Sequence, residues 1–224
     1  MGHDHSHEVK NYNRAFAIGI LLNVAFVIIE AVYGLLANSL SLLADAGHNL
    51  SDVLSLLLAW GASWLSAKAV TQKRTYGFKK VTVLAALISA VLLLIALLGI
   101  FYEALDRFRD PHPVEGMTVI VVAGIGVLIN TATALLFMKD QKRDLNIRGA
   151  FLHMAADAIV SLGVVIAGII ILYKGWLWVD PLMSIMIAVV IFIGTWGLLR
   201  DSVNYAIDAV PNGVDTGEVE SHLM

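Results

Sequence analysis

The sequence predicts an all-α membrane protein with six transmembrane helices. The chain has 224 residues, of which 58% are hydrophobic and only 15% are charged, whereas soluble domains average roughly 45–50% apolar and about 25% charged. Its mean hydropathy is +0.79. Six apolar segments each approach the ~20 residues that a helix needs to cross a bilayer. We therefore expect a multi-pass protein whose surroundings are the lipid bilayer.

The expected helices follow the apolar runs in chain order. Only Ala37 and Asn38 separate the first helix from the second, so these two must be antiparallel neighbours. Pro111 and Pro113 mark the connection between the third and the fourth. The six expected helices span residues 14–36, 39–65, 81–102, 117–138, 147–173 and 176–199.

The distribution of basic residues predicts that both termini are cytoplasmic. Twelve of the 15 Lys and Arg residues lie in the amino terminus, the second and fourth connections, and the carboxyl tail, and such residues concentrate on the cytoplasmic side of membrane proteins. We expect three regions. Residues 1–13 form a His-rich cytoplasmic tail, and residues 14–200 form the membrane domain. Residues 201–224 read as the truncated start of a cytoplasmic domain, since about 25 residues cannot form a core unaided.

The amino-terminal tail contains His3, His5 and His7, which alternate with Asp4 and Ser6. Short His-rich tracts bind metal weakly, whereas chain termini are often disordered. The three histidines are therefore a candidate metal-loading site, with a disordered terminus as the alternative.

Composition also excludes several classes of function. The formal net charge is −3, and the sequence has no basic patch with interleaved aromatic residues, so a nucleic-acid partner is not expected. The chain has no cysteine, so it forms neither disulfides nor thiolate metal sites. Any metal ligands must be nitrogen or oxygen atoms, and nothing in the sequence suggests an organic cofactor.

Residues 39–52, SLSLLADAGHNLSD, place ionisable side chains inside the second apolar segment. Each such group costs about 2.5–3.5 kcal/mol at bilayer depth and therefore suggests a function. His48 and Asp52 are four residues apart, which places them on one helix face. His153 and Asp157 repeat this spacing in the fifth segment.

Two imidazoles and two carboxylates are a ligand set for a tetrahedral zinc ion. The second and fifth helices should run in opposite directions, so His48 should lie level with Asp157, and Asp52 level with His153. Imidazole ligands favour zinc over calcium or magnesium, although cadmium or cobalt could also fit. Because metal ligands must be deprotonated, metal and protons compete for such a site. The set therefore favours exchange of zinc for protons.

Other polar residues in these segments have packing explanations as well as functional ones. Asp45 could orient the His48 imidazole or bond to the first helix, for example to Asn23. Asn49 is expected to hydrogen-bond between helices. Asp180 lies near the start of the sixth helix, where we expect it at the membrane interface.

Glu30 and Asn130 either line a cavity or serve helix packing. Ser161, Gly163 and Gly168 in the fifth segment are expected to allow close helix packing rather than to bind metal.

The chain resembles the cation diffusion facilitator (CDF) family of zinc transporters. The resemblance lies in NSLSLLADAGHNLSD (residues 38–52), KRTYGFKK (residues 73–80) and HMAAD (residues 153–157). It implies a CDF-type transmembrane domain in the cell's inner (plasma) membrane, in which the first, second, fourth and fifth helices form a bundle beside the paired third and sixth. It implies a homodimer that exports zinc from the cytoplasm in exchange for protons by alternating access. The implied transport-site residues are His48, Asp52, His153 and Asp157.

Two departures from the family pattern matter. Family members usually continue into a cytoplasmic metal-binding domain where this sequence ends. Some members carry histidine ligands in the connection that corresponds to residues 66–80, but this segment has no histidine, so no additional site is expected there. The family also suggests a charge pair between Lys80 and Asp208.

Two other classes of function remain as alternatives to a transporter. A membrane metalloenzyme would use bound zinc for hydrolysis, although the sequence lacks H-E-x-x-H and four ligands leave no open position for water. A structural protein would use zinc only to hold helices together, and would then retain the metal against a chelator.

Overall fold

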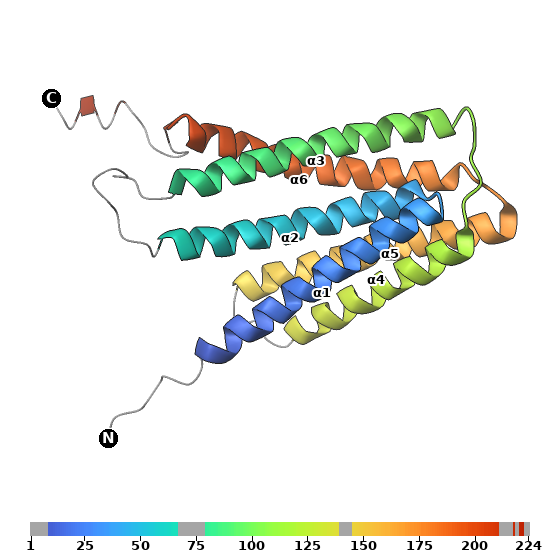
Figure 1. Cartoon of the computed structure of the whole chain (residues 1–224), viewed down its shortest axis with the longest axis horizontal. Coiled ribbons are helices and arrows are strands. Elements are labelled where there is room, and N and C mark those ends of the chain that lie inside the picture. Colours follow the sequence, from blue (N-terminus) through green and yellow to red (C-terminus); the bar gives the residue numbers. More distant parts are fainter. Residues whose placement is uncertain (1–8, 67–78, 139–144, 211–216, 218–219, 222–224) are drawn as a thin grey trace, which may run out of the picture.

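The computed structural model describes residues 9–66, 79–138, 145–210, 217, 220 and 221. All six principal elements in this part of the chain are α-helices (Figure 1), which confirms the all-α prediction. They are α1 (Val9–Leu36), α2 (Leu40–Ser66), α3 (Lys79–Arg107), α4 (Gly116–Phe137), α5 (Leu145–Lys174) and α6 (Val179–Ala206).

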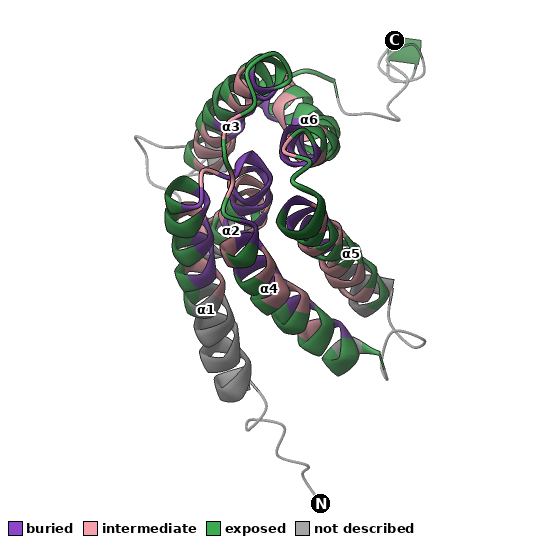
Figure 2. Ribbon diagram, turned by 90° about the vertical axis from the view of Figure 1, so that its right-hand side faces the viewer, coloured by how far each residue is buried: buried purple, intermediate pink, exposed green. Residues whose placement is uncertain are grey.

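The predicted grouping of the helices is also confirmed. Among the described residues, α4 packs most extensively on α5, and α3 packs on α6, while α1 contacts both α2 and α4. Helix α5 meets α2 over a short stretch only. The bundle of α1, α2, α4 and α5 thus lies beside the α3–α6 pair (Figures 1 and 2).

The two ends of the bundle differ. One end, here called the connection end, carries the short links α1–α2, α3–α4 and α5–α6, whereas the start of α1 and the end of α6 lie at the opposite end, here called the terminal end (Figure 1). The main apolar core includes Leu42, Leu97, Val119 and Ile187, which all lie in the helix halves nearest the connection end. Figure 2, viewed from this end, shows buried residues on the mutually facing sides of α2, α5 and α6. The helices are therefore packed most tightly around the connection end.

Four described helical stretches are long and apolar enough to cross a membrane, namely 81–107, 116–136, 151–174 and 179–206. In α1, the apolar stretch among the described residues runs from Asn23 to Leu36 and is shorter than these four. Helix α2 has 27 residues, but Asp45, His48 and Asp52 make its first half less apolar. The protein is thus a multi-pass membrane protein whose second helix carries a concentration of polar groups.

Helices α3 and α6 extend furthest beyond their predicted carboxyl-terminal ends. Helix α3 continues five residues past the expected Tyr102, to Arg107. Arg107 is buried, and its Nε donates to Glu103 one turn earlier at 3.0 Å. Helix α6 begins at Val179 rather than Trp176 and continues to Ala206. Its start is delayed because residues 175–178 form the turn that follows α5, in which the Trp176 and Trp178 rings stack.

Arg107 also fixes the α1–α2 turn. Its guanidinium donates to the backbone oxygen of Asn38 at 2.6 Å and to Asn38 Oδ1 at 2.7 Å. Asn38 has a positive φ of 53°, a conformation that asparagine tolerates better than most residues. Its Nδ2 donates to the Pro113 carbonyl at 3.1 Å, and Glu115 N donates to the Ala37 carbonyl at 3.0 Å. These bonds tie the first connection to α3 and α4.

Asp180 anchors α6 to the start of α2, a contact that the sequence did not reveal. Its side chain is fully buried. One carboxylate oxygen accepts from Leu40 N at 2.7 Å, and the other accepts from Ser41 N and from the hydroxyls of Ser39 and Ser41 at 3.2, 2.7 and 2.6 Å. The first N–H groups of a helix lack intrahelical acceptors, and the positive end of the helix dipole favours an anion there. The N–H groups at the start of α2 therefore explain why the Asp180 side chain is buried against this helix.

We predict that Asp180→Asn lowers the stability of the membrane domain by about 1–3 kcal/mol, since it weakens several charge-assisted hydrogen bonds to one helix start. Thermal unfolding in detergent measures the change. Asp201→Asn makes the same chemical change at an exposed position on the same helix and should leave the unfolding temperature unchanged. Equal stability of Asp180→Asn and Asp201→Asn would contradict the assigned anchoring role.

Candidate metal centre

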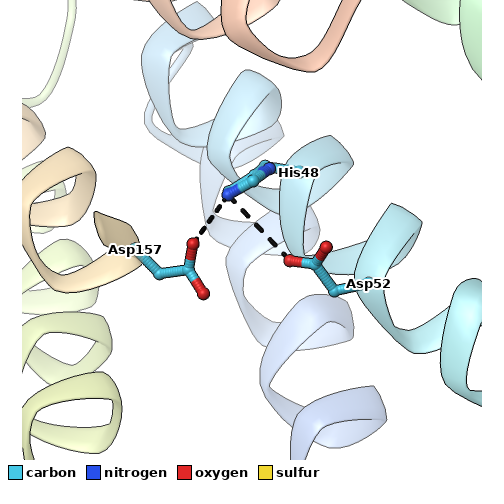
Figure 3. A group of neighbouring side chains, drawn as sticks. All are labelled: His48, Asp52 and Asp157. Carbon is cyan, nitrogen blue, oxygen red and sulfur yellow. Dashed lines mark hydrogen bonds and ion pairs between the residues drawn. The ribbon is translucent and has the colours of Figure 1, made fainter. Parts of the chain in front are cut away.

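Helices α2 and α5 bring the four predicted ligands to their crossing. His48 Nε2 lies 2.9 Å from Asp157 Oδ1 and 3.9 Å from Asp52 Oδ2 (Figure 3). On the other side, His153 Nε2 lies 3.4 Å from Asp52 Oδ2 and 3.7 Å from Asp157 Oδ2. The antiparallel helices therefore place His48 level with Asp157, and Asp52 level with His153, as the spacing predicts.

These separations suit a tetrahedral metal ion. Zinc bonds of about 2.0–2.1 Å imply roughly 3.3 Å between neighbouring ligand atoms. The four nitrogen–oxygen separations, from 2.9 to 3.9 Å, lie on both sides of this value. Both imidazoles present Nε2 to the two carboxylates. The ligand atoms of His48, Asp52 and Asp157 are close enough to surround one ion after small side-chain shifts.

His153 occupies the outer position of the group. The ligand atoms of His48, Asp52 and Asp157 lie within 4.8 Å of one another. The His153 ring centroid is 6.2 Å from that of His48, although its Nε2 is close to both carboxylates. His153 would therefore move toward the other three residues to complete the set.

Exposure rises across the site toward the terminal end of the bundle. The side chains of Asp157 and His48 are 3% and 14% exposed, whereas those of Asp52 and His153 are 28% and 44% exposed. Asp52 Oδ2 is itself buried without a hydrogen-bond partner. A buried acceptor that lacks a donor requires an explanation such as an ion or a proton. The two ligands nearer the terminal end are thus more exposed than the two nearer the connection end.

The polar neighbours of the site make bonds that link helices. Asn49 Nδ2 donates to Glu30 Oε2 of α1 at 2.8 Å, which confirms its predicted interhelical role. Asp45 Oδ2 accepts from Ser161 Oγ of α5 at 3.0 Å. This bond was not anticipated from the sequence. Ser161 lies one helical turn beyond Asp157 on the same face, so its spacing was an available signal.

Close packing explains the glycines that the sequence analysis assigned to it. A Cβ on Gly168 would lie 2.9 Å from Ile120 Cγ1 and 3.1 Å from the Gly116 carbonyl, and one on Gly163 would lie 2.8 Å from Met183 Cε. The glycines thus allow α4 and α6 to pack closely against α5.

Glu30 and Asn130, the two polar residues with either a cavity or a packing role, are both buried.

Two sequence predictions fall outside the described residues. The tail histidines His3, His5 and His7 precede the described part of the chain. The Lys80 side chain is likewise not described, so its pairing with Asp208 stays a prediction.

Comparison with known proteins identifies relatives along nearly the whole chain. The family described as the cation efflux transmembrane domain matches residues 16–205. The chain is 38% identical to the "Cadmium, cobalt and zinc/H(+)-K(+) antiporter" of Bacillus velezensis, over 98% of this chain and 71% of that protein. It is 37% identical to "Zinc transporter ZitB" of Escherichia coli, over 100% of this chain and 73% of that protein. It is 35% identical to "Metal cation efflux system protein CzcD" of Cupriavidus metallidurans, over 100% of this chain and 70% of that protein.

We predict that Asp157→Asn lowers the affinity of the membrane site for zinc by at least ~100-fold, since losing a ligand should exceed the 10–100-fold cost of losing an outer hydrogen-bond partner. Isothermal titration of the purified chain with zinc measures this effect, in a background where alanine replaces His3, His5 and His7 so that the tail does not contribute. Asp106→Asn alters an exposed carboxylate near the end of α3 and should bind zinc normally. Unchanged affinity in Asp157→Asn would exclude Asp157 as a ligand.

Proposed function

The chain belongs to the cation diffusion facilitator family, and from this premise we propose that it is a secondary transporter that exports Zn²⁺ from the cytoplasm in exchange for protons. Family membership makes it a multi-pass membrane transporter rather than an enzyme, so the metalloenzyme alternative is set aside. The observation that carries the proposal is the convergence of two imidazoles and two carboxylates at the α2–α5 crossing.

The charge of the site suits a divalent ion. Asp52 and Asp157 together neutralise one divalent cation, and His48 and His153 complete the shell as neutral ligands. The names of the relatives include zinc, cadmium and cobalt. The mixed nitrogen and oxygen set is consistent with zinc as the main substrate of this chain, with cadmium or cobalt as alternatives.

Proton exchange follows from ligand competition. Each imidazole nitrogen and each carboxylate binds either the metal or a proton. A carrier that returns without metal would leave two carboxylates together inside the bundle, and protonation relieves their repulsion. Protons are therefore the natural counter-ion of this site.

The asymmetry of the bundle supports alternating access. The more exposed metal ligands lie nearer the terminal end, which the basic residues assign to the cytoplasm. At the connection end, the bonds of Asp180 and Arg107 hold the helices together. We propose that this arrangement is the state that receives metal from the cytoplasm, and that release requires the connection end to open. As the family resemblance implies, we also expect the working unit to be a homodimer.

The test uses sealed vesicles that contain the purified chain and report zinc and pH with separate dyes. Zinc should cross the membrane while protons move in the opposite direction, and a protonophore should not abolish zinc movement down its gradient. Asp157→Asn should stop both fluxes, whereas Asp106→Asn should support both. Zinc that binds but does not cross would instead support a structural role, and zinc movement without proton flux would contradict the exchange.

A further inference from the structure

A second buried polar cluster lies beside the metal centre, on the side of the connection end. It joins Glu30 of α1, Asp45 and Asn49 of α2, and Ser161 of α5. Glu30 and Ser161 are fully buried, Asp45 is 1% exposed and Asn49 is 8% exposed. The cluster thus contains two carboxyl groups that are almost completely buried.

These carboxyl groups contact neutral donors and each other. Glu30 Oε2 accepts from Asn49 Nδ2 at 2.8 Å, and Asp45 Oδ2 accepts from Ser161 Oγ at 3.0 Å. The two carboxyl groups also lie within hydrogen-bonding reach of one another. Among the described residues, no salt bridge reaches either of them. The ionisable neighbours that act on Asp45 from farther away are His48 and Asp157.

Keeping both of these adjacent, buried carboxyl groups ionised would cost a large amount of free energy. Burying a single ion costs several kcal/mol even after relaxation, and two carboxylates that share a site favour binding one proton between them. Glu30 Oε1 is a buried oxygen without a hydrogen-bond partner. A proton on this oxygen would turn it into a donor, so that it would no longer be a buried acceptor without a partner.

We propose that Glu30 and Asp45 form a carboxyl–carboxylate pair that binds one proton, carried on Glu30 Oε1 and donated to Asp45. The proton satisfies the vacant oxygen, leaves Oε2 to accept from Asn49, and reduces the charge of the pair to −1. The site is a proton site distinct from the metal ligands. It links α1 to α2 next to His48, and α2 to α5 one turn from Asp157.

The geometry favours a proton over a metal cation. A shared proton needs two carboxyl oxygens within hydrogen-bonding reach, and the pair provides them. Hard cations such as calcium or magnesium take six or more oxygen ligands. Here one oxygen of each carboxyl group already accepts from a neutral donor, so the cluster offers too few free oxygens for such a shell.

Infrared difference spectroscopy of the purified, metal-free chain at neutral pH tests this proton directly. The native protein should show the C=O band of a buried protonated carboxylic acid, which shifts in D₂O. The band should disappear in Glu30→Gln and in Asp45→Asn but remain in Asp157→Asn. Glu30→Gln is a mild change, because its amide can donate to Asp45 and accept from Asn49, and it should bind zinc as the native chain does.

Asn49→Ala provides a second variant that keeps both carboxyl groups. It removes the donor to Glu30 Oε2, so the C=O band should move to higher wavenumber without being lost. The proposal is overturned if the native chain lacks the band, if the band survives Glu30→Gln, or if potassium or sodium chloride abolishes it in a saturable manner. The last result would assign the pair to a metal cation. These measurements involve no transport, so failure of the zinc-exchange assay would not produce any of these outcomes.

Discussion

Each carboxylate inside this helical bundle must be matched by donors or by a cation, because ionised groups are costly in an apolar interior. Asp180 meets this requirement with the free N–H groups at the start of α2. Asp45 and Glu30 use Ser161 and Asn49. The remaining carboxylates, Asp52 and Asp157, face two imidazoles, and the buried Asp52 Oδ2 lies 3.4 Å from His153 Nε2 without a hydrogen bond. The same constraint thus accounts for the anchoring of the bundle and for a site with the chemistry of a divalent-metal carrier.

Two sets of polar contacts also make the two ends of the bundle different. Asp180 joins α6 to α2, and Arg107 joins α3 to the α1–α2 turn, both at the connection end. Helix α5 meets α2 over a short stretch only, and the metal ligands nearer the terminal end are the more exposed ones. A transporter needs one closed side and one accessible side. The closed side must also be held by bonds that can break and re-form when the protein changes conformation. Hydrogen bonds to one carboxylate are contacts of this kind.

The sequence was sufficient for the features that depend on periodicity. Apolar segment length predicts six helices, and the paired His-x-x-x-Asp spacings predict which residues meet, including His48 with Asp157. It was insufficient where partners are distant in the chain. The anchoring role of Asp180 cannot be read from the sequence, because the start of α2 that it contacts lies 140 residues away. The extension of α3 depends on Arg107 contacting Asn38, a tertiary contact that helix propensity does not encode. Ser161 shows an intermediate case, since its spacing from Asp157 indicates the face it occupies but not the partner, Asp45.

The most direct test of the central claim is the coordination of zinc bound to the full chain, measured by X-ray absorption spectroscopy at one zinc per chain. Alanines at His3, His5 and His7 remove the tail as a competing site. Zinc bound at the α2–α5 crossing should have four ligands at about 2.0–2.1 Å, two of them imidazoles and two of them oxygens, and Asp157→Asn should lose this signature. A shell with six oxygen ligands, or one that is unchanged in Asp157→Asn, would contradict binding at the α2–α5 crossing.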